Sequence, residues 1–242
     1  MRNKLIALVL GILCHLSFCV AILLMAYMLF EGLTKSLVPV TQYGRYVNFL
    51  LLIQFPLLHS FLLSKKGRML LELPFPKGLG RDLSTTTYGL IASLQLIAVF
   101  LFWTPNQQIW FVPTGVVYYL SSLLYLLSWG LLLKALGEAG LAMHTGYLGW
   151  SAVFAGRKPE YPNLCSKGLH NCTRHPIYLA FSLIILTAPV WSFDHFVLAA
   201  VWVSYCVFGP LLKEKRMLKR YGEEYRQRQN KIPYLIPKLP FI

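Results

Sequence analysis

Two short apolar runs near the C-terminus constrain the fold of this chain more than any other feature. The first covers Ile177–Trp191 and the second Phe196–Leu212, and only Ser192-Phe193-Asp194-His195 separates them. As helices they are about 22 and 25 Å long, a little short of a hydrocarbon core of about 30 Å. Two short apolar helices with such a brief break are expected to fold as an antiparallel hairpin.

The open end of this hairpin is expected to gather polar side chains. Arg174 and Glu214 lie at equal distances along the chain from position 194, which falls in the predicted turn. The hairpin therefore brings Arg174, His175 and Glu214 together at a membrane surface. Taken singly, each residue is typical of the charged flank of a membrane helix. Together, a cation, an imidazole and a carboxylate predict a binding or catalytic site.

The composition extends this interpretation to the whole chain. Hydrophobic residues make up 56% of the sequence and the mean hydropathy is +0.55, which excludes an ordinary soluble domain. We therefore expect an all-α polytopic membrane protein with five or six transmembrane helices, the last of them forming the hairpin. Before the hairpin, the apolar segments are about Leu5–Phe30, Tyr46–Leu63, Tyr88–Trp103 and Val116–Leu133.

The distribution of Lys and Arg predicts the orientation. If the N-terminus is cytoplasmic and six segments span, the cytoplasmic pieces hold 21 of the 23 basic residues, and only Lys35 and Arg45 are external. This asymmetry puts both termini in the cytoplasm. The net charge of +14 is then explained by topology and anionic membrane lipid, so no nucleic-acid partner is expected.

The chain is expected to form one integral membrane domain over residues 1–242. Four N-terminal spans occupy 1–134, a cytoplasmic interfacial segment 135–175, the hairpin 176–212 and a cytoplasmic tail 213–242. The five cysteines do not have the spacing of a metal site, so no metal is expected.

The second apolar segment carries polar residues that should face the interior of the helix bundle, because polar groups are costly at membrane depth. Among them His59 falls near the predicted cytoplasmic end, on the same side as the hairpin mouth, and is a candidate site residue. Before the third segment, Ser84-Thr85-Thr86-Thr87 is expected to cap the helix.

The motif around the hairpin has a chemical interpretation of its own. Pro176 sits where a helix would begin, at the position in the first turn that tolerates proline. Arg174 is a fixed cation suited to bidentate carboxylate binding, and Glu214 offers an acceptor for an ammonium, a hydroxyl or a sulfonium.

The tail after the hairpin is expected to continue as a helix. Glu214, Leu218, Tyr221 and Tyr225 recur at helical spacing and should share one face. Gly222 would cost such a helix about 1 kcal/mol against alanine, so its presence suggests the close approach of another group to the backbone.

The order of these residues resembles a known family. Arg-His-Pro-x-Tyr, the hairpin, Glu214, Tyr-Gly-x-x-Tyr and Pro-x-x-Ile-Pro resemble the C-terminal signature of membrane methyltransferases that depend on S-adenosylmethionine. Leu58-His59-Ser60, the stretch from Tyr88 to Leu94 and Trp103-Thr104-Pro105 resemble the branch that contains methanethiol S-methyltransferase, the NnrU proteins and nurim. The resemblance covers roughly residues 50 to 238.

The resemblance implies S-adenosyl-L-methionine as cofactor, bound at the hairpin, and a small thiol or lipophilic methyl acceptor. The residues that it implies for cofactor binding are Arg174, His175, Pro176, Tyr178, Ala180, Glu214, Tyr221, Gly222 and Tyr225. The candidate catalytic residues are His175, Arg174, Glu214 and His59.

Three departures from the family pattern keep alternatives open. Lys213 stands where the family has a first glutamate, and Ala180 where it has a glycine close to the cofactor. These two favour a non-enzymatic protein of the nurim or NnrU kind. The stretch from Tyr147 to Trp150 differs from the Gly-Leu-Arg-Gln of methanethiol-type members, which leaves isoprenylcysteine carboxyl or phospholipid methylation as further alternatives.

Overall fold

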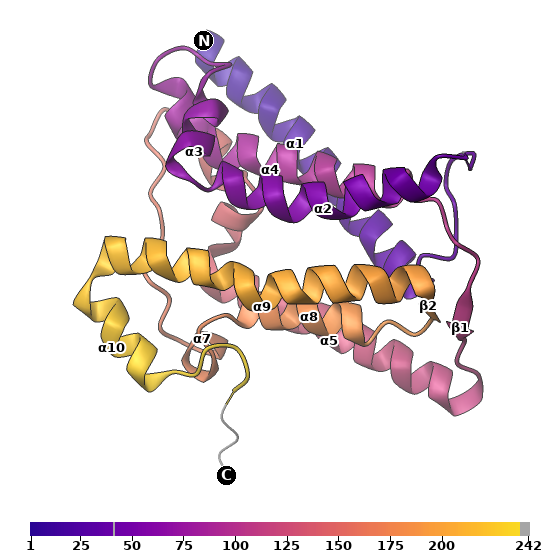
Figure 1. Cartoon of the computed structure of the whole chain (residues 1–242). Helices are drawn as coiled ribbons and strands as arrows, with labels where there is room; N and C mark the ends of the chain where they lie inside the picture. The colour runs from indigo at the N-terminus through magenta and orange to yellow at the C-terminus, as the bar shows by residue number, and fades with distance from the viewer. Residues whose placement is uncertain (41, 238–242) are drawn as a thin grey trace. The chain divides into compact units, whose positions relative to one another are not determined.

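A computed structural model gives the structure of the chain and describes residues 1–40 and 42–237. The described residues form ten helices and two short strands (Figure 1). They divide into two compact units that alternate along the sequence. The first unit comprises Met1–Gln108 and Gly140–Pro162, and the second comprises Ile109–Ala139 and Asn163–Ile242.

The first unit is built around the packing of α1 against α4. Its helices are α1 (Arg2–Phe30), α2 (Gly44–Leu62), α3 (Lys65–Glu72), α4 (Leu79–Leu101) and α6 (Tyr147–Phe154). Helix α6 packs on both α1 and α4, and α2 and α3 each pack on α4. The helices assemble because small and apolar side chains of α1 and α4 bury one another, as Ala7 and Leu83 do.

Polar side chains of α2 face the α4 side of the unit and are paired there, as expected for polar groups in a membrane bundle. The Asn48 amide donates to the Thr104 carbonyl at 2.6 Å, and the Gln95 amide donates to Gln54 Oε1 at 2.7 Å. At the other end of α2, the Tyr88 hydroxyl lies 2.6 Å from His59 Nε2.

The start of α4 corrects one expectation. The helix begins at Leu79, with Gly78 as N-cap at a φ of 86°, so the prediction that residues 84–87 cap it is wrong. The hydroxyls of both threonines have other partners: Thr87 donates to the Leu83 carbonyl one turn back in α4 at 3.2 Å, and Thr86 donates to the carbonyl of Gly146, the N-cap of α6, at 2.7 Å. Threonine serves equally well at a cap or bonded to a carbonyl one turn back, so composition alone misplaced the boundary.

The second unit holds most of the C-terminal half of the chain. Its elements are β1 (Ile109–Phe111), α5 (Gly115–His144), α7 (Leu169–Cys172), α8 (Pro176–Leu186), β2 (Trp191–Ser192), α9 (Phe193–Tyr221) and α10 (Glu223–Lys231). Helix α5 is broken at Gly140, where φ is 102° and the chain passes into the first unit.

Helices α8 and α9 pack against each other and are joined by residues 187–192 (Figure 1). The predicted break at 192–195 is wrong in position, because Ser192 caps α9 by accepting from the His195 N–H at 3.0 Å. Helix α8 instead ends at Leu186, ahead of Pro189, whose ring disfavours a helix before it. At 11 residues it is only about 16 Å long.

Within the part of the chain that the structure describes, four helices are long and apolar enough to cross a membrane: α1, α4, α5 and α9. A fifth candidate is the pair α2 and α3, which is bent by 88°. The expectation of an all-α polytopic membrane protein is therefore confirmed, with four or five long spans. Helix α8 is too short to be counted among them.

A two-stranded ribbon ties the α8–α9 connection to the segment before α5. Strands β1 and β2 pair antiparallel, with Ile109 opposite Ser192 and Phe111 opposite Trp191. The entry to α5 and the turn between α8 and α9 therefore lie at the same end of the second unit.

Candidate active site

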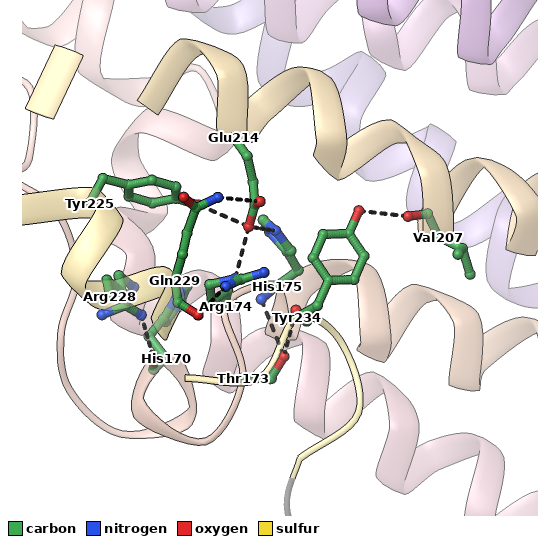
Figure 2. A network of polar contacts seen from close by, with 10 residues as sticks. All are labelled: His170, Thr173, Arg174, His175, Val207, Glu214, Tyr225, Arg228, Gln229 and Tyr234. Atoms are coloured by element: carbon green, nitrogen blue, oxygen red, sulfur yellow. Dashed lines mark hydrogen bonds and ion pairs between the residues drawn. The ribbon is translucent and has the colours of Figure 1, made fainter. Parts of the chain in front are cut away.

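The start of α8 places two of the predicted site residues. Pro176 occupies the first turn of α8 and His175 is its N-cap, so Arg174 lies just outside the helix. Proline is favoured there because the first N–H groups of a helix have no internal partner. Figure 2 shows Arg174 and His175 pointing toward Glu214 of α9.

Glu214 is the centre of the site, and its side chain is only 9% exposed. Oxygen Oε1 lies 2.8 Å from the Arg174 Nε, 3.0 Å from the His175 Nε2 and 3.3 Å from the donating Tyr225 hydroxyl. The second oxygen, Oε2, accepts from the Gln229 side-chain amide at 2.7 Å. A buried carboxylate needs such compensation, and here four side chains supply it.

Arg174 is held by more than the carboxylate. Its Nη1 donates to the Gln229 backbone carbonyl at 2.7 Å, and its backbone N–H donates to the Pro233 carbonyl at 3.0 Å. The guanidinium also lies over the Tyr234 ring, 5.5 Å from the centroid. The cation therefore joins the start of α8 to α10 and to the segment that follows it.

His175 is fully buried and neutral. Burial, and then the charge of Lys213, lower the pKa of its imidazole to about 4, and the contact with Glu214 offsets this only in part. The neutral ring donates its Nε2 hydrogen to Glu214, which leaves Nδ1 as an acceptor. Within the described residues, this buried Nδ1 has no hydrogen-bond partner.

The segment after α10 lies across the start of α8 (Figure 2). The Thr173 hydroxyl donates to the Tyr234 carbonyl at 3.1 Å, and the Tyr234 hydroxyl donates to the Val207 carbonyl at 2.7 Å. The Tyr234 ring meets the His175 ring edge to face at 4.9 Å between centroids. Tyr234 therefore links α8, α9 and the C-terminal segment.

Helix α10 supplies residues that the sequence interpretation missed. Gln229 contacts both Glu214 and Arg174, and buried Arg228 donates to the His170 carbonyl. The available signal was a new helix after Gly222, in which Tyr225, Arg228 and Gln229 share one face.

The expected continuous helix through Tyr221 and Tyr225 is wrong. Helix α9 ends at Tyr221, and Gly222 adopts φ 55° and ψ −124°, so Tyr225 reaches Glu214 from a separate helix. A Cβ on Gly222 would meet no atom within 4 Å. The glycine is therefore required for its backbone conformation and not for the close approach of another group. The Arg220 guanidinium carbon lies over the Tyr221 ring, 5.2 Å from the ring centroid.

The remaining candidates are placed as follows. Tyr178 lies on α8 with Lys213 Nζ 5.9 Å from its ring centroid, and Ala180 is fully buried on the same helix. His59 belongs to the first unit, where it pairs with Tyr88. The structure thus brings together Arg174, His175, Glu214 and Tyr225, with Pro176 and Tyr178 beside them.

The fold and this polar cluster define a polytopic helical membrane protein with a buried charged site at the start of α8. The chain matches, over residues 77–232, the family described as "Protein of unknown function (DUF1295)". It belongs to this family.

Similar proteins include three that are named methanethiol S-methyltransferase. The protein of Pseudomonas deceptionensis is 27% identical over 80% of this chain, and the first such enzyme of Bradyrhizobium diazoefficiens is 28% identical over 79%. The protein of a Pseudomonas species is 31% identical over 64%. The alignments span 72%, 66% and 60% of the lengths of these relatives. No solved structure matches the chain.

Proposed function

We propose that the chain is a membrane methyltransferase that uses S-adenosylmethionine and methylates a small thiol of the methanethiol kind. The observation that carries the proposal is the cluster of Arg174, His175 and Glu214, because these are the positions that the resemblance implies for cofactor binding. The names of the relatives support the reaction and the class of acceptor.

The charges of the site fit the amino-acid end of this cofactor. A carboxylate such as Glu214 suits its ammonium group, and a guanidinium such as Arg174 suits its carboxylate. In the structure these two residues form an ion pair with each other. A bound cofactor would replace this ion pair with one contact to each residue. The buried His175 Nδ1 offers a further acceptor for a ligand donor.

When bound, S-adenosylmethionine supplies an electrophilic methyl group on a sulfonium sulfur. The chain's own residues position the partners and exclude water. Methyl transfer would break the methyl–sulfur bond of the sulfonium and form the new S–C bond, and the S–H proton of the acceptor would pass to bulk water as the thiol ionises on entry. An imidazole whose pKa is about 4 is a weak base, so we assign His175 a hydrogen-bonding role. The cations Arg174 and Lys213 favour the thiolate form of the acceptor.

The direct test uses purified full-length protein in nanodiscs with methanethiol and S-adenosylmethionine that carries a deuterated methyl group. We expect labelled dimethyl sulfide, detected by gas chromatography with mass spectrometry. Glu214→Gln should weaken binding of S-adenosylhomocysteine roughly 30-fold or more, because truncating one partner of a buried charge pair costs about 2–5 kcal/mol.

The matched control is Glu223→Gln, because Glu223 lies on the neighbouring helix with a side chain that is 70% exposed. This variant should keep wild-type binding and turnover. Binding of S-adenosylhomocysteine without any dimethyl sulfide would overturn the thiol acceptor and leave the cofactor site standing. Neither binding nor product would refute the proposal as a whole.

A second candidate function is a non-enzymatic membrane protein of the nurim or NnrU kind. It is favoured by one observation: both carboxylate oxygens of Glu214 already have partners within the chain. Oε1 pairs with Arg174, and Oε2 accepts from Gln229. The cluster would then act as a clamp between α8, α9 and α10. In that case S-adenosylhomocysteine should not bind, and Glu214→Gln should lower only the unfolding temperature.

A further inference from the structure

A hollow at the junction of α3 and α4 combines charged and apolar groups. Its volume is about 370 Å³, near the lower end of the range for small-molecule sites. The lining residues include Glu72, Lys77 and Arg81. Within the described residues, neither Lys77 nor Arg81 has an ion-pair partner. Two cations without an ion-pair partner in the lining of a hollow suit a ligand with a negative charge.

An apolar groove adjoins this hollow. It has a volume of about 350 Å³ and is lined only by apolar residues of α1 and by Phe75. Phe75 lines both the groove and the charged hollow, so the two are neighbours. The residues that α1 contributes are Leu5, Ile6, Val9, Leu10 and Leu13. A ligand that fills both must have a charged end and a hydrocarbon end.

Helix α3 has the character of a helix that lies in a membrane interface. It makes an angle of 88° with α2, which is a candidate span only together with α3. Its exposed side chains are of two kinds, the basic Lys65, Lys66 and Arg68 and the apolar Met69 and Leu70. Such a helix rests at the level of the lipid headgroups, which puts the charged hollow at that depth.

From these observations we infer that the first unit binds a phospholipid with a net negative headgroup. The phosphate lies against Lys77 and Arg81, and one acyl chain runs along the groove beside Phe75. The charges select the headgroup: residues 64–87 contain five Lys and Arg against the two acidic residues Glu72 and Asp82. The groove favours a lipid over a free anion, because an acyl chain would cover the apolar surface of the groove and inorganic phosphate would not. This site is independent of the proposed methyl transfer.

The test measures lipid retained by the purified full-length chain with native mass spectrometry, after titration with phosphatidylglycerol or phosphatidylcholine of identical acyl chains. We expect phosphatidylglycerol to be retained at concentrations at least tenfold lower. The variant Lys77→Gln with Arg81→Gln should weaken phosphatidylglycerol binding roughly tenfold or more and leave the unfolding temperature unchanged.

The control is Lys65→Gln with Lys66→Gln. It also removes two positive charges, but from α3 residues that do not line the hollow. This control should retain phosphatidylglycerol as the wild type does. Equal weakening by both double variants would overturn the site, because charge alone would then explain binding. Equal retention of the two lipids would also overturn it. Displacement of phosphatidylglycerol by inorganic phosphate at similar concentration would mean a simple anion site, and would refute a phospholipid.

Discussion

Arg174 and Glu214 form an ion pair of 2.8 Å between Nε and Oε1, with side chains that are only 11% and 9% exposed. The pair joins a residue two positions before the start of α8 to the last third of α9. Two charges so poorly hydrated stabilise each other, and each becomes costly when it is left alone.

A double-mutant cycle on this pair should therefore show strong coupling. Arg174→Gln and Glu214→Gln should each destabilise the protein by about 3–5 kcal/mol, because each leaves one buried charge without its partner. The double variant should lose much less than the sum. Unfolding temperatures in detergent provide the measurement, and additive losses would show that the two residues do not interact.

Gln229 should matter although no sequence motif marks it. Its amide hydrogen bond to Glu214 is charge-assisted, so Gln229→Ala should cost about 1.5–3 kcal/mol. Gln227→Ala is the matched control, because Gln227 is exposed on the same helix. Equal unfolding temperatures for the two variants would rule out a role of the Gln229 side chain in holding the carboxylate.

The buried imidazole of His175 predicts a dependence of stability on pH. Its pKa of about 4 in the folded protein lies below the ordinary value of 6.5, so between these values the unfolded chain binds a proton that the folded chain does not. Stability should therefore fall as pH decreases from about 6.5 to 4, by up to about 1.4 kcal/mol per pH unit. His175→Gln should remove this part of the slope. An identical pH profile for wild type and variant would contradict the assignment.

Replacing Gly222 by alanine should destabilise the protein, whereas the same change at a glycine inside a helix should not. Its φ of 55° and ψ of −124° are accessible mainly to glycine, so Gly222→Ala should destabilise by about 1–3 kcal/mol. Gly137→Ala in α5 is the comparison: Gly137 is exposed, and a Cβ there meets no atom within 4 Å. That change should be neutral or slightly stabilising. Similar effects of both changes would mean that backbone conformation is not what Gly222 provides.

The orientation of the chain in the membrane is also testable. The placement of the basic residues predicts that a reporter inserted at Asn106 is external and one fused after Ile242 is cytoplasmic. Because β1 pairs with β2, a cysteine at exposed Phe193, directly after β2, should be labelled from the same side as one at Ile109. A cytoplasmic signal at Asn106 would contradict the proposed orientation.

The sequence predicted the apolar helices well where lipid sets their limits. The runs beginning at Leu5, Tyr46 and Val116 start within three residues of α1, α2 and α5, because hydropathy reports which side chains face lipid. The same signal failed at α4, which begins nine residues before the predicted Tyr88. That first part of the helix is polar and is held by packing, which hydropathy does not detect.

The sequence predicted the part of the candidate site that depends on the spacing of residues around the hairpin. Arg174, His175 and Glu214 meet because one helix begins where its packed partner approaches its end. The contacts of Arg174 with the carbonyls of Gln229 and Pro233 involve backbone acceptors that every residue possesses. Such contacts depend on the turn at Gly222, and the spacing of residue types along the sequence does not predict them.

The alternation of the two units along the chain has a consequence for synthesis. The first unit has all its residues once Pro162 has been made, whereas the second begins at Ile109 and needs α9 and α10. Helix α5 is therefore inserted long before the helices of its own unit exist. Its long apolar surface must meanwhile be covered by lipid or by an insertion factor. A ribosome that stalls between Pro162 and α9 would leave a complete first unit attached to an orphan span.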